Sequence, residues 1–199
     1  MAEVIKVSEG VPADGRRARR HRSRDLAVDA LLDLLNEGIA RPTAQQVAER
    51  SGVSLRSIFR IFDDVQSLHT AASERQMSRV RHLFVDIVAT GTLEERVQAT
   101  VATTSRLYES VGPIRRAALR AAPESAALQL QLNRARGWLR AEIDRVFAEE
   151  LGRLGDPDRT AAVEAILSFE AWDQLRTAQG RSVARAVATV SLTVQTLLR

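Results

Sequence analysis

The side chains best placed to bind another molecule lie on a short predicted helix that follows Ser54. Ile58 and Phe62, four residues apart, give this helix one buried stripe, so the remaining positions face solvent. The exposed residues of the helix are Leu55, Arg56, Ser57 and Arg60. Arginine and serine side chains on one exposed helix face can hydrogen-bond phosphate oxygens and the edges of nucleic acid bases.

A second short helix and a tight turn precede this face, within residues 43–62 (TAQQVAERSGVSLRSIFRIF). Thr43 and Gln46 have the spacing of a capping box, which predicts a helix start. Gly52 can adopt the left-handed conformation that ends a helix, and Ser54 can cap the next one. A helix, a short turn and a second helix with an exposed Arg/Ser face is the geometry that enters a DNA major groove. The alternative is a packed helical hairpin that binds no DNA.

The same stretch resembles the DNA-binding signature of the tetracycline-repressor (TetR) family. The matching residues are Gly38, Thr43, Val47-Ala48, Ser51-Gly52-Val53-Ser54, Ser57-Ile58, Phe59 and Phe62. The resemblance implies an all-α protein with an N-terminal three-helix helix-turn-helix domain and a C-terminal helical domain for effector binding and dimerisation. It implies a transcriptional regulator, most simply a repressor, that binds a palindromic operator in double-stranded DNA as a homodimer.

The resemblance also implies roles for individual residues. Arg56 would read a base, guanine through paired hydrogen bonds, and Leu55 would touch a thymine methyl group. The role of positioning the duplex through phosphates or base edges would fall to Thr43, Ser54, Ser57 and Arg60. The expected DNA-binding residues are Thr43, Ser54, Leu55, Arg56, Ser57, Phe59 and Arg60.

Two positions depart from the family pattern. Members often have a tyrosine at the position of Phe59 and usually a lysine at the position of Val65, and both side chains meet phosphates. Neither group is present here, and Asp63 and Asp64 add negative charge nearby. These departures support an alternative function, a helical ligand-binding or interaction dimer whose DNA-binding head has decayed.

Composition limits the other function classes. The 199-residue chain has no cysteine and a net charge of +4, yet residues 1 to 75 hold 12 basic and 11 acidic residues, so local distribution matters more than the total. His21, His69 and His82 lack metal-ligand spacing, and no phosphate-binding glycine loop or serine nucleophile motif occurs. We therefore expect no enzyme, no cofactor and no metal site. Without a long apolar run, we expect a cytoplasmic protein with no membrane contact.

Composition shifts predict three parts: a disordered basic N-terminal arm at residues 1–22, a helix-turn-helix domain at 23–73, and a helical domain at 74–199. Six arginines lie between Arg16 and Arg24, at the end of the arm and the start of the next part, and they can follow phosphates or form a solvated leader. We expect the first helix at residues 23–36, with a core face formed by Leu26, Ala30, Leu31, Leu34 and Leu35.

The rest of the chain has helical periodicity throughout. We expect a long helix at residues 65–88, with the domain boundary inside it near Ser73, and a capping box at Thr92 and Glu95. Gly112-Pro113 and Pro123 predict breaks, followed by helices at residues 125–154, 158–179 and 182–198.

The last two helices carry broad apolar faces, and the final one has a heptad pattern. In the resembled family these helices pair with their copies in a four-helix interface. The expected interface residues are Ile166, Phe169, Val183, Val187, Val190, Val194 and Leu197. Coverage of the chain's own core is the alternative, and we favour the dimer.

A small-molecule effector, partly apolar and of unknown identity, is also implied by the resemblance. Large or hydroxyl-bearing side chains of the C-terminal helices are candidates to line its pocket, although each could be an ordinary core residue. The candidates are Phe84, Thr104, Tyr108, Trp138, Phe169 and Trp172.

Overall fold

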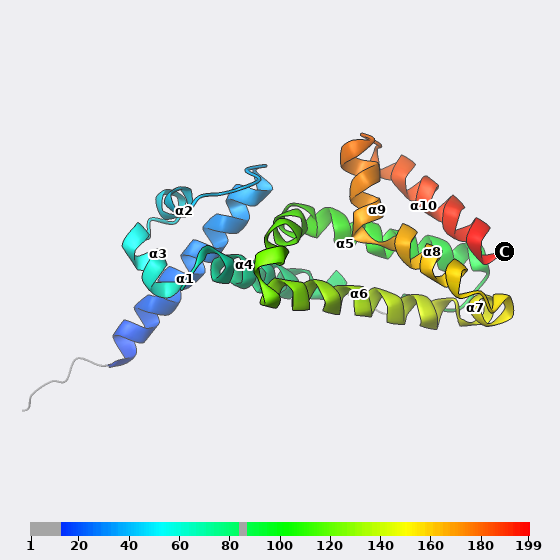
Figure 1. Cartoon of the computed structure of the whole chain (residues 1–199), viewed down its shortest axis with the longest axis horizontal. Coiled ribbons are helices and arrows are strands. Elements are labelled where there is room, and N and C mark those ends of the chain that lie inside the picture. Colours follow the sequence, from blue (N-terminus) through cyan, green and yellow to red (C-terminus); the bar gives the residue numbers. More distant parts are fainter. Residues whose placement is uncertain (1–12, 84–86) are drawn as a thin grey trace, which may run out of the picture. The chain divides into compact units, whose positions relative to one another are not determined.

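The computed structural model describes residues 13–83 and 87–199, which form helices and connecting segments without any strand. The predicted all-α fold class is confirmed. The chain divides into two compact units, Met1–Ala72 and Ser73–Arg199 (Figure 1).

The N-terminal unit is a small helical domain built on α1 (Ala13–Asn36). Helices α2 (Ala44–Ser51) and α3 (Leu55–Ile61) both pack against α1 and against each other (Figure 1). The first half of α4 (Val65–Val80) completes the unit. Its buried core includes Val28, Leu31, Leu32, Leu35, Val47, Ile58, Phe62 and Leu68.

Helix α1 differs from its prediction in two respects. It begins at Ala13, so residues 13–22, expected to be part of a disordered arm, are helical; residues 1–12 lie outside the described residues. Arginine and alanine are good helix formers, and no glycine or proline follows Gly15 in this stretch. The prediction that Leu26 belongs to the core is wrong, because its side chain is 47% exposed and Ala27 and Val28 are buried instead.

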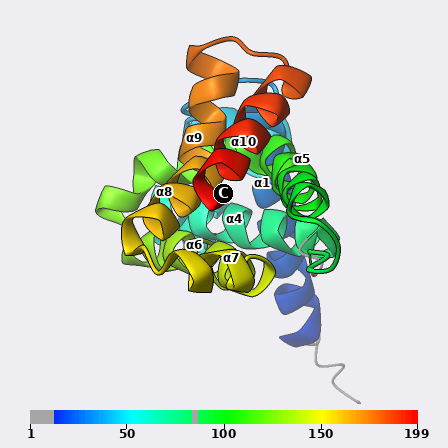
Figure 2. The ribbon, with the colours of Figure 1, turned by 90° about the vertical axis from the view of Figure 1, so that its right-hand side faces the viewer.

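The C-terminal unit consists of the second half of α4 and the helices that follow residue 87. They are α5 (Leu93–Ala121), α6 (Ala126–Val146), α7 (Ala148–Leu154), α8 (Pro157–Leu167), α9 (Phe169–Asp173) and α10 (Val183–Leu198). Short 3-10 turns lie at Arg81–Leu83 and Ala122–Glu124, and a π-helical turn at Gln174–Ala178 continues α9. Helix α10 packs between α5 and α8 (Figure 2).

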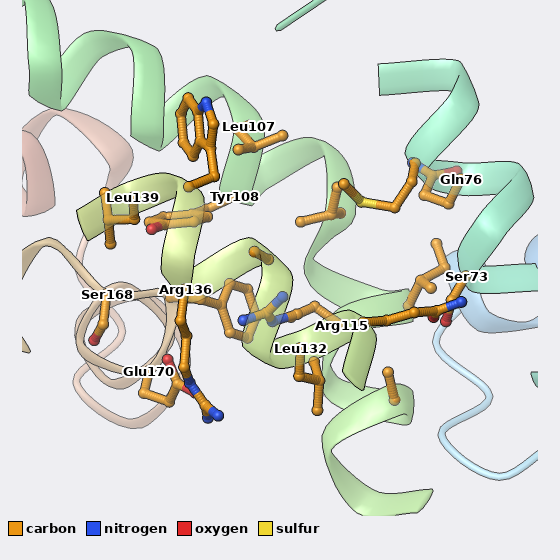
Figure 3. Close-up of a pocket in the computed structure, with 18 residues that line it drawn as sticks. Ser73, Gln76, Leu107, Tyr108, Arg115, Leu132, Arg136, Leu139, Ser168 and Glu170 are labelled. Atoms are coloured by element: carbon orange, nitrogen blue, oxygen red, sulfur yellow. The ribbon is translucent and has the colours of Figure 1, made fainter. Parts of the chain in front are cut away.

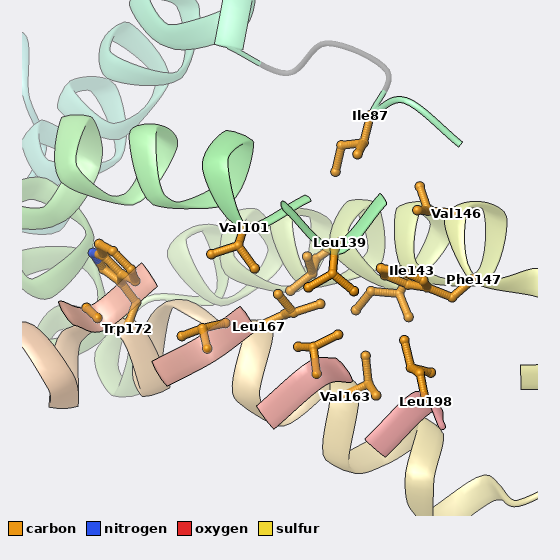
Figure 4. Close-up of a cluster of buried hydrophobic side chains, with 14 of the residues drawn as sticks. Ile87, Val101, Leu139, Ile143, Val146, Phe147, Val163, Leu167, Trp172 and Leu198 are labelled. Carbon is orange, nitrogen blue, oxygen red and sulfur yellow. The ribbon is translucent and has the colours of Figure 1, made fainter. Parts of the chain in front are cut away.

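One large apolar cluster holds these helices together (Figure 4). Its fully buried members include Val97, Ile143, Phe147, Val163, Val194 and Leu198. A buried ion pair between Arg96 of α5 and Glu150 of α7 lies in the same unit, and Arg96 Nη1 also donates to the Val146 carbonyl at 2.7 Å. Because both charged partners are paired and hydrogen-bonded, the core can enclose them.

Several predicted helix ends are wrong. Pro113 does not break the chain but lies inside α5, where Val111, Gly112 and Ile114 are buried, so packing outweighs the one hydrogen bond that proline removes. The two long helices predicted at 125–154 and 158–179 are interrupted at Phe147 and Ser168. The helix α4 ends at Val80, before the predicted end at residue 88.

Candidate nucleic-acid interface and ligand pocket

The helix-turn-helix is fixed by hydrogen bonds at the start of each helix. Thr43 Oγ1 accepts from the Gln46 amide at 3.2 Å, and Gln46 Oε1 accepts from the Thr43 amide at 2.9 Å, which completes the predicted capping box. Gly52 ends α2 with φ 67°, a left-handed conformation that a residue with a Cβ rarely adopts. Ser54 then caps α3 by accepting from the Ser57 amide at 3.3 Å. These contacts hold α3 at a defined angle to α2.

The outer face of α3 presents two arginines that are not paired with any described residue. Arg56 and Arg60 are exposed, and within residues 13–83 and 87–199 neither side chain forms an ion pair or hydrogen bond. Phe59 lies on the exposed surface too, with 55% of its side chain accessible. The buried Ile58 anchors the opposite face of the helix. The guanidinium groups are therefore available to a ligand with negative charge.

Other predicted contact residues are already engaged. The Thr43 hydroxyl donates to Gln46 Oε1 at 3.1 Å, and the Ser54 hydroxyl donates to Ser57 Oγ at 2.9 Å. Since Ser57 accepts this bond, its own hydroxyl hydrogen remains able to donate outward. Leu55 is half-buried at the start of α3.

Two acidic residues around the motif, Glu37 and Asp64, have structural partners. Glu37 accepts two hydrogen bonds from Arg50, each 2.7 Å long, and this pairing lowers the pKa of Glu37 and raises the pKa of Arg50. Asp64 Oδ1 accepts from the Ser67 amide at 2.6 Å and so caps α4. Val65, at the first position of α4, is 41% exposed. Asp64 therefore has a capping function, while Phe59 and Val65 place apolar side chains where the resembled family has phosphate-binding groups.

The N-terminal turns of α1 carry further positive charge. Arg16, Arg17, Arg19, Arg20 and Arg22 are exposed on these turns. Arg24 is half-buried, with its guanidinium 5.7 Å from the centre of the Phe62 ring. This contact joins α1 to the residue that ends α3.

The C-terminal unit contains a cavity of about 80 Å³, lined by residues of α4, α5, α6 and α9 (Figure 3). Of the candidate pocket residues, Tyr108, Trp138 and Phe169 line it. Thr104 and Trp172 are buried elsewhere: the Thr104 hydroxyl bonds the Thr100 carbonyl at 2.9 Å, and the Trp172 indole donates to Glu109 at 2.8 Å. Phe84 lies outside the described residues.

The cavity wall is mainly apolar, with a few polar groups. The Tyr108 hydroxyl donates to the Leu167 carbonyl at 2.8 Å, and burial raises the pKa of this phenol. The sequence reading missed Ser73, Arg115 and Gln131, which also line the space. Arg115 is half-buried beside Ile114 and Ala118, and the sequence has no signal that distinguishes it from a surface arginine.

The predicted dimer residues fall into two groups. Phe169, Val190 and Val194 are buried by the chain's own helices, so a partner could reach them only after repacking. The half-buried or exposed members are Ile166, Val183, Val187 and Leu197. Leu192, absent from the prediction, is 67% exposed on α10 and is the most accessible large apolar side chain of that helix.

No group of three or more histidine, cysteine, aspartate or glutamate side chains within the described ranges could hold a metal ion. None of the helices described combines the length and apolar character needed to cross a membrane.

Comparison with known proteins yields similarity in structure only. No family model matches the sequence, and no curated protein matches it. A transcriptional regulator from Rhodococcus sp. Rha1 superimposes with a TM-score of 0.64 at 16% identity, over 90% of this chain and 95% of the other. A TetR-family transcriptional regulator from Streptomyces coelicolor gives 0.62 at 20% identity, over 91% and 79% of the two chains.

A third structure, a proposed transcriptional regulator from Streptomyces coelicolor A3(2), gives a TM-score of 0.58 at 19% identity, over 87% of this chain and 98% of the other. Identities this low establish similarity of fold. The chain therefore has the fold of TetR-family transcriptional regulators, which confirms the resemblance noted in residues 38–62.

Proposed function

We propose that this protein is a DNA-binding transcriptional regulator whose α3 helix enters the DNA major groove. The observation that carries the proposal is that Arg56 and Arg60 are exposed on α3, a helix capped by Ser54, and form no ion pair or hydrogen bond within the described ranges. A guanidinium without a protein partner can form bidentate hydrogen bonds to guanine or contact a phosphate without breaking an existing ion pair. Fold similarity to transcriptional regulators supports the same function.

The contacts follow from the position of each side chain on α3. Arg56, in the first turn, would read a base, as N-terminal residues of recognition helices do. Arg60, one turn later, and the outward hydroxyl of Ser57 would fix the register on the backbone. The exposed arginines of α1 would add sequence-independent attraction to phosphates.

The functional unit in this proposal is a homodimer. Leu192 and Val183 are exposed on α10, and a second copy of α8 and α10 would cover them in an interface related by two-fold symmetry. Two recognition helices in one dimer require a palindromic operator with half-sites about one helical turn apart.

The proposed activity is repression that a small molecule relieves. The cavity includes Ser73, Gln76 and Met77 of α4, and α4 is the helix that directly follows α3 in the chain. A ligand that binds one conformation of α4 more tightly than another shifts the population toward it. DNA affinity changes to the extent that the two conformations differ in their affinity for the operator.

Fluorescence anisotropy tests the proposal with labelled DNA from upstream of the protein's own gene and a scrambled duplex of equal length. We expect tighter binding to the upstream DNA, with log affinity falling linearly as log salt rises. The slope reports the number of phosphates neutralised. Equal affinity for both duplexes, or no binding at low salt, would contradict the proposal.

The second candidate function is a helical ligand-binding or interaction dimer with a decayed DNA-binding head. Exposed apolar groups at Phe59 and Val65 favour it, because each replaces a phosphate contact of the resembled family. The same anisotropy series separates the two functions, since the decayed head predicts no preference for any operator sequence.

A further inference from the structure

Four buried side-chain atoms of the C-terminal unit have no hydrogen-bond partner within the described part of the chain. One is Glu164 Oε1, which lies 2.7 Å from Arg140 Nε in an ion pair, and the other three line one cavity. These three are Ser73 Oγ on α4, Arg115 Nε on α5 and Gln131 Oε1 on α6. Buried polar atoms in folded proteins are nearly always paired, because an unsatisfied group keeps the full cost of losing its water. Three such atoms around one space indicate a site that is completed by another molecule.

Arg115 makes this site electrostatically positive. Its guanidinium lies over the Phe169 ring, 5.7 Å from the ring centre, and forms no ion pair within the described part of the chain. Burial lowers the pKa of Arg115, which means that its charge is poorly solvated. Arginine nevertheless stays protonated in proteins, so this half-buried side chain brings a positive charge to the cavity, which Glu170 partly offsets.

The carboxylate that partly offsets this charge, Glu170, already forms an ion pair with Arg136. Glu170 lines the cavity, but its Oε1 accepts a hydrogen bond from Arg136 Nη2 at 2.8 Å, and both side chains are substantially exposed. In Figure 3, Arg136 and Glu170 lie at one end of the pocket, Ser73 at the other, and Arg115 between them. With two arginines and one glutamate, the charged lining has a net positive charge of one.

The remaining wall suits an apolar body. Tyr108 and Phe169 meet edge to face, with ring centroids 5.6 Å apart, and Trp138 lies in the same lining. An adjoining groove of about 560 Å³ shares Gln131 and Trp138 with the cavity, so a ligand can extend beyond the enclosed part. Aromatic walls with a few convergent polar groups are typical of small-molecule sites.

We propose that this cavity binds a small organic acid with an apolar, preferably aromatic, body and a hydroxyl group. The carboxylate accepts hydrogen bonds from Arg115, and the hydroxyl donates to Gln131 Oε1. Ser73 Oγ, which can donate or accept, bonds whichever of the two groups reaches α4. The inference gives a chemical class to the effector, and it rests on the proposed function for the claim that binding affects DNA.

Isothermal titration calorimetry on the full chain tests the charge requirement with matched probes. The acids are benzoate and its 2-, 3- and 4-hydroxy derivatives, and the controls are the corresponding uncharged benzamides. We expect at least one hydroxybenzoate to bind at least tenfold more tightly than its amide and more tightly than benzoate, as loss of a charge-assisted hydrogen bond predicts. No binding by any acid, or equal binding by acid and amide, would overturn the proposal.

Substitutions then locate the binding groups. Arg115→Gln should lower the affinity for the hydroxybenzoate by roughly 10- to 100-fold, so that the acid no longer binds more tightly than its amide. The matched control is Arg116→Gln, because Arg116 pairs with Asp173 at 2.7 Å and does not line the cavity. Gln131→Leu should remove the advantage of the hydroxybenzoate over benzoate while benzoate binding persists. Retention of full acid preference in Arg115→Gln would refute the role of Arg115.

The melting temperature of the variants distinguishes an arginine that binds a ligand from one that only stabilises the fold. The Arg115 charge is poorly solvated and forms no ion pair within the described residues, so Arg115→Gln should leave the melting temperature of the ligand-free protein unchanged or raise it. Loss of an arginine that stabilises the fold would lower the melting temperature. If Arg115→Gln does not fold, the role of Arg115 fails in its proposed form, and Gln131→Leu still tests the cavity as the binding site.

DNA binding separates this inference from the proposed function. An acid that binds in an Arg115-dependent manner but leaves operator affinity unchanged would uphold the inference and contradict ligand-relieved repression. If the protein binds its operator but none of the acids, the proposed function would be upheld and the inference about the ligand would be contradicted.

Discussion

The arginines of α3 and those of the C-terminal helices differ in how their charge is balanced. On α3, Arg56 and Arg60 have no ion pair in the described part of the chain. In the C-terminal unit most arginines of α5, α6 and α8 pair with carboxylates. Examples are Arg96–Glu150, Arg116–Asp173, Arg136–Glu170, Arg140–Glu164 and Arg159–Asp156.

The pairing state of an arginine therefore indicates its role more reliably than the composition of the chain does. A paired arginine joins two helices, and its charge is cancelled within the protein. An arginine that the fold fixes in place but leaves unpaired has its charge directed at something outside the chain. Arg56 meets this description on an exposed face, and Arg115 meets it inside a cavity. The predictions below test whether pairing state separates structural arginines from binding arginines.

The largest effect is expected from Glu150→Ala. It would leave Arg96 buried and unpaired, since the two side chains are only 10% and 7% exposed. Breaking a buried ion pair by removing one partner costs about 3–5 kcal/mol of unfolding free energy. Urea unfolding followed by tryptophan fluorescence measures this loss, and Glu149→Ala, an exposed neighbour, is the control. An equal loss of unfolding free energy in Glu150→Ala and Glu149→Ala would show that the pairing of Arg96 does not stabilise the fold.

The ion pairs Arg96–Glu150 and Arg176–Glu109 should make the free energy of unfolding depend on pH. The hydrogen bond from Arg96 lowers the pKa of Glu150, and the hydrogen bond from Arg176 lowers that of Glu109. The unfolded chain then takes up protons at a higher pH than the folded chain, so the contribution is present above the ordinary glutamate range. It is lost as the pH falls through the lowered pKa values. Unfolding curves from about pH 6 to 3 should show this loss, with a shallower dependence in Glu150→Ala.

Arg56→Ala should change DNA binding rather than folding. We expect a loss of about 1–3 kcal/mol on the operator and relaxed preference at one base pair, with the unfolding midpoint unchanged. Anisotropy with single-base operator variants measures both quantities. Uniform weakening on every sequence would assign Arg56 to the phosphate backbone instead.

The smallest expected effect compares Arg60→Ala with Arg50→Ala. Arg60 is unpaired, so its loss should reduce the slope of log affinity against log salt by about one. Arg50 is bound by Glu37 through two hydrogen bonds, so its loss should leave that slope unchanged. Equal slopes in the two variants would show that pairing state does not determine which arginine contacts DNA.

The helix-turn-helix could be predicted from sequence because local chemistry specifies it. The Thr43 capping box, the left-handed Gly52 and the Ser54 cap each depend on residues within four positions of one another, and all three are present. Tyr108, Trp138 and Phe169 were also identified as residues that line the cavity, since large side chains on apolar helix faces face inward.

The remaining features depend on contacts between distant segments. The heptad pattern of the last helix does not show which of its members its own core covers, and Val190 and Val194 are buried against α5 and α8 rather than exposed to a partner. Arg115 looks like any surface arginine in the sequence. Only the packing of α4, α6 and α9 around it reveals that it is enclosed.

Pro113, in the middle of α5, gives the cavity wall a mechanical property. Proline has no amide hydrogen, so the Glu109 carbonyl lacks the bond that each neighbouring turn of the helix has. Helices bend most readily where such a bond is missing. The turns on either side of this point carry Tyr108, Val111, Ile114 and Arg115, all of which line the cavity. The most compliant point of α5 therefore lies in the wall of the cavity, where molecules of different size can be accommodated by flexing one turn of backbone.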